Sequence, residues 1–322
     1  MGLGSIKTAW QRQTLKFGHD EGEKYSSLIF DNRGMGGSDK PIMRYSTSDM
    51  AKDVIELLGH LGWTEERQLH VTGVSMGGMI AQELVSAHFP LFWVWVWLRG
   101  EVWLTIWKAY QIPTRIASLN LLSTAAAIEN TTSFVENLRT RINMFIPKSL
   151  DRSITDAARS LFADTWLEKR DDCPIPTAST PNVVLRTDAA GAPRAYKTFN
   201  TNFERFAAQE LSKRLDTASF TKQGFMLQAI AAGWHHKSAQ QLKEIGDKVG
   251  RERIMVVHGT NDNMITVPHG RKLIEMLEPG KAVIKEGMGH VAMIEEERMH
   301  NELVEQQIEK VRKYDKNNGV KV

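Results

Sequence analysis

The sequence predicts an α/β protein with a mostly parallel sheet and helices on both faces. Two observations carry this prediction. Near both ends of the chain, short apolar stretches alternate with amphipathic helical patterns, and a long helical section separates the two ends. Strands that alternate with helices are typical of parallel sheets enclosed between two helical layers. The length of 322 residues allows two domains, or one large domain with an insertion.

The first part of the α/β core is predicted over residues 1–124. Its strands are short apolar runs bounded by turn residues, and its helices carry apolar residues on one face. Thr47 or Ser48 is the expected N-cap of the first helix, because a hydroxyl there can accept a hydrogen bond from a free amide. The predicted elements are a strand over Ser27–Phe30, a helix over Thr47–Leu61, a strand over Gln68–Thr72, a helix from Met76 to about Ser86 and a strand over Ile116–Leu122.

The middle section, residues 125–232, is predicted to be a helical cap inserted into the core. Apolar residues recur there at helical spacing in two places. The stretch between them, Asp171–Pro193, holds four of the ten prolines and predicts a loop. The alternative is that these helices simply add to the core. The two helical patterns run through Phe134, Leu138, Ile142 and Phe145 and, less regularly, through Phe203, Phe206, Leu211 and Leu215.

The second part of the core is predicted over residues 233–322. Arg253–Val257 and Ala282–Ile284 are expected to be strands, and Glu295–Tyr314 is expected to be a closing amphipathic helix. Strands and helices alternate here as they do at the start of the chain, so both ends are expected to contribute to one sheet.

Composition and charge exclude several classes of function. Apolar residues make up 42% of the chain and charged residues 25%, which is typical of a globular protein. The net charge of +3 is too small, and its distribution too even, to indicate nucleic acid as a partner. The single cysteine, Cys173, excludes an internal disulfide and a cysteine-rich metal site, and no His-Glu-x-x-His pair offers a zinc site.

The termini and the apolar stretches predict a cytoplasmic protein. Residues 1–6 lack the basic start and apolar run of a signal peptide, and the C-terminus matches no peroxisomal or prenylation signal. The unbroken apolar stretch Phe89–Leu98 is far shorter than the ~20 residues of a membrane span. We therefore expect no membrane span.

The clearest functional motif is Gly73-Val74-Ser75-Met76-Gly77, which lies between a predicted strand and a predicted helix. Gly-x-Ser-x-Gly in this context is a nucleophile elbow, a sharp turn that exposes the serine hydroxyl at the carboxyl edge of a sheet. The glycines allow the turn and let the helix pack closely behind it. The helix N-terminus then lies beneath the reacting centre, where negative charge develops. Ser75 is therefore the candidate nucleophile.

Two further residues are candidates for a catalytic triad with Ser75, because a serine nucleophile needs a base and the base needs an orienting carboxylate. Asp262 ends a glycine turn after one predicted strand, and His290 follows the next strand between a glycine and a helix. Each candidate follows the carboxyl end of a strand, so the three side chains are expected to converge at one edge of the sheet. His258 lies beside Asp262 in the sequence and is interpreted as orienting the acid turn.

No cofactor is expected. The run Gly287–Ala292 mimics a dinucleotide-binding fingerprint after a strand, but no second strand follows it to complete a βαβ unit. A P-loop is also absent from the sequence.

These motifs resemble those of serine hydrolases of the α/β-hydrolase superfamily, of the esterase- and lipase-like kind. The run Asp31–Pro41 is similar to the turn after one core strand in these proteins, and the run Gly259–Pro268 is similar to their acid loop. The resemblance covers nearly the whole chain. It implies an α/β-hydrolase fold with an inserted helical cap, Ser75 as nucleophile, Asp262 as acid, His290 as base and the Met76 amide as one oxyanion donor.

The resemblance is incomplete at the N-terminus. Family members carry strands before a His-Gly-x-x oxyanion loop, whereas Met1–Gly4 matches the loop itself, with Met1 where the histidine would be. We therefore expect that the first strands are missing and that Leu3 supplies the second oxyanion amide from a chain end. Chain ends fray unless they are tied down, and the loss of one oxyanion donor costs on the order of 10²–10³ in rate.

The segment Leu91–Tyr110 is interpreted as an insertion. The sequence separation between Ser75 and Pro113 is about twice what a helix of ~12 residues and a loop of ~4–6 would fill. We interpret the segment as translated non-coding sequence, such as a retained intron, and expect it to project from the core. A tryptophan-rich anchor at a membrane interface is the alternative. The excess holds five of the nine tryptophans, which are Trp93, Trp95, Trp97, Trp103 and Trp107.

The sequence therefore predicts an enzyme that hydrolyses a carboxylic ester, or a related acyl bond of a small molecule, through an acyl-enzyme on Ser75. Within this class, a lactonase, a thioesterase, a peptidase of the proline-iminopeptidase type and an acyltransferase all stay open, because the residues of the cap do not separate them. The alternative outside this class is a non-catalytic or inactive protein of the same fold, since the N-terminal strands and the oxyanion loop are incomplete.

Overall fold

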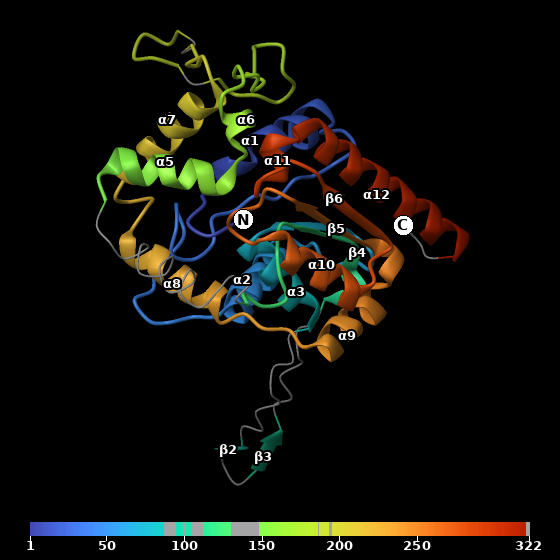
Figure 1. Ribbon diagram of the computed structural model, residues 1–322. Helices are drawn as coiled ribbons and strands as arrows, with labels where there is room; N and C mark the ends of the chain where they lie inside the picture. The colour runs from blue at the N-terminus through green and yellow to red at the C-terminus, as the bar shows by residue number, and fades with distance from the viewer. Residues whose placement is uncertain are drawn as a thin grey trace.

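The computed structural model describes residues 1–86, 95–98, 101–104, 112–129, 148–185, 187–192 and 195–319, with the backbone alone for 95–98 and 101–104. Within these ranges the chain forms a four-stranded sheet with helices around it and a separate two-stranded hairpin (Figure 1). Some predictions fall outside the described residues, namely the helical pattern through Phe134, Leu138, Ile142 and Phe145, and residues Trp93 and Trp107.

The main sheet is parallel, as the alternation of strands and helices predicts. Its strands lie in the order β1-β4-β5-β6, and every neighbouring pair runs parallel. The carboxyl ends of all four strands therefore meet at one edge. The bounds lie within two residues of the predicted ones: β1 (Leu69–Val74), β4 (Ile116–Leu122), β5 (Ile254–Gly259) and β6 (Lys281–Lys285).

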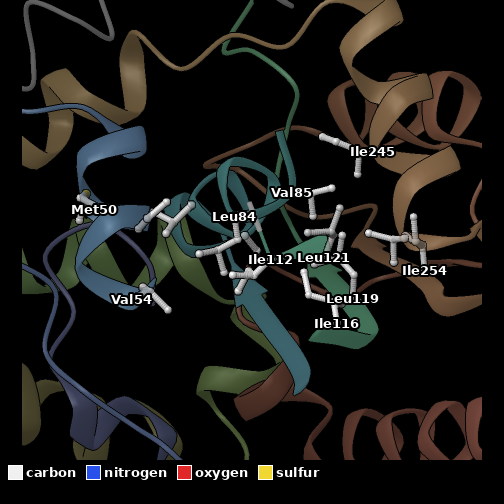
Figure 2. Close-up of a cluster of buried hydrophobic side chains, with 14 of the residues drawn as sticks. Met50, Val54, Leu84, Val85, Ile112, Ile116, Leu119, Leu121, Ile245 and Ile254 are labelled. Carbon is white, nitrogen blue, oxygen red and sulfur yellow. The ribbon is translucent and has the colours of Figure 1, made fainter. Parts of the chain in front are cut away.

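Within the described residues, one face of the sheet packs against four helices. Leu119 and Leu121 of β4 are fully buried there beside Leu84 and Val85 of the helix that follows β1 (Figure 2). Successive residues of a strand point to opposite faces, so this layer takes alternate residues of β4. The covering helices are α2 (Thr47–His60), α3 (Met76–Ser86), α9 (Ala239–Val249) and α10 (Val267–Leu277).

The opposite face of the sheet packs against both ends of the chain. Leu122 of β4 and Met255 of β5 are buried there with Trp10 from the N-terminal region and Ile308 from the closing helix. The elements on this side are η1 (Lys7–Trp10), α1 (Gln11–Gln13), η2 (Thr14–Asp20), α11 (Ala292–Glu295) and α12 (Glu297–Asn317). Two short 3-10 turns lie elsewhere in the chain: η3 (Pro113–Arg115) directly precedes β4, and η4 (Arg251–Arg253) directly precedes β5.

The section predicted to be a cap contains helices between β4 and β5. Phe162 and Trp166 stack with ring centroids 4.5 Å apart, and both are buried in the cluster that also holds Leu122. The described residues of the predicted loop Asp171–Pro193 contain no helix. The division of the chain at residues 125 and 232 stays a prediction. The described helices are α5 (Leu150–Leu161), α6 (Asp164–Leu167), α7 (Asn202–Leu215) and α8 (Lys222–Gly233).

The prediction of a strand over Ser27–Phe30 is wrong. These residues have no regular secondary structure and are exposed or half-buried. A strand needs a neighbour for its backbone hydrogen bonds, and none of the described residues forms a ladder with this stretch. The apolar composition of Ser27–Phe30 therefore predicted a strand, but no described segment pairs with these residues.

The predicted N-cap of α2 is also wrong. Ser46 caps the helix: its side chain accepts a hydrogen bond from the Asp49 amide at 3.1 Å, and the Asp49 carboxylate accepts one from the Ser46 amide at 3.0 Å. This reciprocal pair is a capping box. Thr47 instead lies in the first turn with its hydroxyl 3.0 Å from Nδ1 of the buried His235.

Part of the segment interpreted as an insertion forms a hairpin of its own. β2 (Trp95–Leu98) pairs antiparallel with β3 (Glu101–Leu104), and the two form a sheet separate from the main one. In Figure 1 this hairpin lies apart from the labelled helices of the core. The interpretation as an insertion stays a prediction. In the described part of the chain, every helix is too short or too polar to cross a membrane.

Candidate active site

The three candidate catalytic residues follow three strands of the main sheet. Ser75 comes directly after β1, Asp262 follows the end of β5, and His290 follows β6. Because these strands are parallel, all three residues lie beyond the same edge of the sheet, where open α/β sheets bind ligands. The sequence predicted this arrangement from the position of each residue after a strand.

Ser75 lies in a sharp turn with left-handed backbone geometry. Its φ is +56°, which is uncommon for a residue other than glycine and costs conformational energy. The turn is held by its neighbours: the Ser75 amide donates to the Leu122 carbonyl at 2.9 Å, and the Thr124 hydroxyl donates to the Ser75 carbonyl at 2.7 Å. A serine in a strained backbone conformation at a strand–helix junction is what a nucleophile elbow requires.

Two glycines around Ser75 have no room for a side chain. A β-carbon at Gly73 would overlap the backbone of Gly77, and one at Gly78 would lie 2.6 Å from the Thr124 side chain. The start of α3 therefore packs directly against β1 and the end of β4. This is the physical reason for the glycines on either side of the serine.

Asp262 and His290 form a buried hydrogen-bonded pair. Nδ1 of His290 lies 2.7 Å from Oδ2 of Asp262, and each residue is only 3% exposed. A carboxylate only accepts hydrogen bonds, so Nδ1 carries the proton and donates it. The other ring nitrogen, Nε2, is then the one that can act as a base. The main-chain amide of His290 also donates to the Leu161 carbonyl at 2.7 Å, which fixes the residue from its backbone.

The Asp262 carboxylate is held on both oxygens. Oδ1 accepts hydrogen bonds from the amides of Met264 at 2.9 Å and Ile265 at 2.8 Å. Burial alone would raise the pKa of Asp262, but the positive potential and hydrogen bonds of His290 and His258 outweigh this and lower its pKa to about 2. Asp262 is therefore ionised in the folded protein at neutral pH.

His258 contacts the same acid turn. Its Nε2 lies 2.6 Å from the Ile265 carbonyl and 3.3 Å from Oδ2 of Asp262. A carbonyl accepts hydrogen bonds, so Nε2 carries a proton and donates it to the Ile265 oxygen. These contacts support the interpretation that His258 orients the acid turn.

The position of Ser75 relative to His290 is less direct. Among the hydrogen bonds of the described residues, none joins the Ser75 hydroxyl to the His290 ring. Val74 packs in the same buried cluster as Met288 and Val291, which flank His290. Catalytic hydrogen bonds are often long in the absence of substrate. The structure thus brings Asp262 and His290 together, and the complete triad stays a prediction.

The two predicted oxyanion donors are the amides of Met76 and Leu3. Met76 begins α3, so its amide is one of the first-turn donors without an acceptor inside the helix. Gly2 passes close to the serine: a β-carbon there would lie 3.4 Å from Cβ of Ser75 and 3.8 Å from its Oγ. Leu3 follows directly. Both assignments stay predictions.

The comparisons with known proteins agree with this fold. A family model described as the alpha/beta hydrolase fold matches residues 16–297. The chain belongs to this family. Membership supports an enzyme of the hydrolase class and explains why a sequence of this pattern folds around a parallel sheet.

The chain matches under a third of the length of a curated lactonase, and its fold is similar to those of solved enzymes. It is 38% identical to 3-oxoadipate enol-lactonase 2 of Acinetobacter baylyi over 88 residues, which are 27% of this chain and 30% of the relative. Its fold is similar to that of Est816, described as an N-acyl homoserine lactone degrading enzyme, with a TM-score of 0.59, 17% identity and coverage of 95% and 90% of the two chains. A thermophilic esterase from Thermogutta terrifontis gives a TM-score of 0.58, 16% identity and coverage of 95% and 86%.

Two residues that contact the loop beside Ser75 were not predicted from the sequence. Lys213 of α7 and Gln228 of α8 both hydrogen-bond to Gly4. Each is more than two hundred positions away from Gly4 in the sequence, and neither belongs to a motif, so no sequence signal pointed to them. Among the described residues, no group of three or more His, Cys, Asp or Glu side chains could hold a metal ion.

Proposed function

We propose that this hydrolase cleaves a carboxylic ester, or a related acyl bond, of a small molecule through an acyl-enzyme on Ser75. The observation that carries the proposal is the buried pair of Asp262 and His290, beyond the same sheet edge as the strained Ser75 turn. A carboxylate that fixes a histidine in one tautomer is the arrangement that activates a serine hydroxyl.

The first half of the reaction forms the acyl-enzyme. Nε2 of His290 takes the hydroxyl proton of Ser75 while Oγ forms a bond to the carbonyl carbon of the substrate. The carbonyl oxygen becomes an oxyanion, which accepts hydrogen bonds from the amides of Met76 and Leu3. As this intermediate collapses, the bond to the leaving alcohol breaks, and His290 gives the proton to the alcohol oxygen.

The second half of the reaction releases the acid. His290 takes a proton from water, and the water oxygen forms a bond to the acyl carbon. The second tetrahedral intermediate collapses, the bond to Oγ of Ser75 breaks, and the proton returns to the serine. Asp262 stays ionised throughout and stabilises the imidazolium that forms in each half, as its pKa of about 2 allows.

A lactone is the first candidate substrate within this class. The similarity to an enol-lactonase over 88 residues favours it. A lactone is an internal ester, so the same steps open its ring and release a hydroxy acid. Thioesters, peptide bonds with an N-terminal proline and acyl transfer to another alcohol are the alternatives that use the same acyl-enzyme.

A fluorophosphonate probe tests the proposal directly, because it phosphonylates a serine only where the serine is activated. We expect the wild-type chain to be labelled on Ser75 and the Ser75→Ala variant to stay unlabelled. Hydrolysis of p-nitrophenyl acetate, of a six-membered lactone and of a thioester then ranks the substrate classes. Labelling that survives Ser75→Ala would overturn the nucleophile. A folded wild-type chain that resists the probe would favour a non-catalytic protein of this fold.

A further inference from the structure

The loop beside Ser75 is attached to two helices of the middle section through one residue. The Gly4 amide donates to Oε1 of Gln228 at 2.9 Å, and the Gly4 carbonyl accepts a hydrogen bond from Nζ of Lys213 at 3.0 Å. Gly4 directly follows Leu3, whose amide is the second oxyanion donor of the proposed function. Both polar groups of this residue are therefore fixed by side chains from α7 and α8.

Gly4 could not be replaced by another residue in this position. Its φ is +66°, in the left-handed region that favours glycine, and a β-carbon would lie 2.8 Å from the ring of Phe225 in α8. The loop is therefore pressed against α8 by packing as well as held by hydrogen bonds. It has little freedom to slide along the helix.

Gln228 connects this loop to a second one. The side chain is fully buried, and while Oε1 accepts from Gly4, Nε2 donates to the Arg33 carbonyl at 2.9 Å. Both polar groups of the amide are thus used, which fixes its orientation. Gln228 therefore links α8 both to the loop beside Ser75 and to the turn after residue 31.

Lys213 reaches the loop from α7. Its side chain is 13% exposed, and Nζ lies 2.7 Å from the Glu210 carboxylate and 5.3 Å from the centre of the Phe220 ring. Burial lowers the pKa of Lys213, while Glu210 opposes this shift. A long charged side chain held in this way acts as a fixed donor rather than a mobile surface group.

We infer that Gln228 and Lys213 are positioning residues that hold the Leu3 amide toward Ser75. The inference rests on the proposed function, in which that amide stabilises the oxyanion. An oxyanion donor must be held in place before the reaction, because its benefit depends on its not having to reorganise as charge develops. The two side chains supply this support from helices that contain none of the catalytic residues.

The test compares matched glutamine variants of α8. Gln228→Met removes both hydrogen bonds at similar side-chain volume. Gln223→Met changes an exposed glutamine of the same helix, whose side-chain amide donates to the Ile42 carbonyl at 3.5 Å. We expect Gln228→Met to lower kcat for p-nitrophenyl acetate at least tenfold, toward the ~10²–10³-fold that loss of an oxyanion donor costs. KM is expected to change little, and Gln223→Met is expected to keep both constants.

Lys213→Met provides a second variant in case Gln228→Met fails to fold. Glu210 keeps a partner in Arg214, at 2.7 Å, so the substitution leaves no unpaired carboxylate. We expect a lower kcat with unchanged KM, and faster hydrogen exchange at the amides of residues 3–5. A merely structural role would lower the melting temperature and leave kcat of the folded fraction unchanged.

The outcomes separate the inference from the proposed function. If the wild-type chain reacts with the probe and both methionine variants keep the wild-type kcat, the positioning role is wrong and the triad stands. A loss that appears only in KM would also overturn it, because it would place the two residues in substrate binding. If the folded wild-type chain neither reacts nor hydrolyses any ester, the proposed function fails and the inference fails with it.

Discussion

Nδ1 of His290 donates a 2.7 Å hydrogen bond to Oδ2 of Asp262, and both side chains are buried. The bond leaves Nε2 of the histidine as the only ring nitrogen without a proton. A base for a serine hydroxyl needs this tautomer. The remaining Asp262 oxygen is occupied by two backbone amides, so the carboxylate cannot rotate without losing all of its partners.

Asp262→Asn is expected to lower turnover of an ester substrate by about 10⁴-fold, as when a triad carboxylate becomes an amide. The amide can donate a proton to Nδ1 and so favours the wrong tautomer of His290. The kcat for p-nitrophenyl acetate measures the effect, with the exposed neighbour variant Asn263→Ala as the control. A near-normal rate for Asp262→Asn would mean that another carboxylate orients His290.

Protonation of Asp262 is expected to make the folded protein less stable in acid. Its pKa falls from 3.8 in the unfolded chain to about 2 in the fold. The stabilisation of roughly 2 kcal/mol is therefore complete above about pH 5 and is lost as the pH falls from there toward 2. Urea unfolding at pH 5, 4 and 3 should show the wild-type chain losing stability relative to Asp262→Asn. A constant difference between the two across this range would contradict the low pKa.

Gly78→Ala is expected to destabilise the fold by ~1–3 kcal/mol, the range for inserting an atom into a packed core. The new β-carbon would lie 2.6 Å from the Thr124 side chain, which also holds the Ser75 carbonyl. Gly59→Ala in α2 is the matched control, because a β-carbon there meets nothing within 4 Å. It is expected to stabilise the protein by ~0.5–1 kcal/mol through helix propensity. Thermal unfolding compares the two, and equal effects would contradict the packing argument.

Deletion of residues 91–110 is expected to raise the soluble yield and to leave labelling of Ser75 by a fluorophosphonate intact. The segment carries five tryptophans, a composition that favours aggregation when exposed. Ile112 is kept, because it is fully buried and its amide donates to the Leu84 carbonyl at the end of α3. An insoluble or unfolded deletion variant would show that the segment belongs to the fold.

The elements that depend on local sequence were predictable. The glycines around Ser75 marked the turn because β1, α3 and the turn need close backbone contact at adjacent positions. Asp262 and His290 were predictable for a similar reason, since each follows an apolar strand and a glycine turn. The bounds of the strands before them were predicted from the residues of a short stretch of chain.

The elements that depend on distant partners were not predictable. Ser27–Phe30 has the composition of a strand, but pairing is decided by another part of the chain. Thr47 is a good cap residue by type, but its hydroxyl lies against the His235 ring, 188 positions away, which no local pattern marks. Gln228 reaches Gly4 across 224 positions with a single amide, which no local pattern marks.

The attachment of Gly4 limits how the middle of this protein can be exchanged with that of a relative. Replacing helices α7 and α8 to change the substrate would also remove Gln228, Lys213 and the Phe225 ring that fills the space beside the glycine. A chimaera that keeps residues 1–5 from this chain therefore needs these three side chains retained, or a loop and a helix pair transferred together. An exchange of α7 and α8 that omits these side chains is therefore expected to change turnover as well as the substrate.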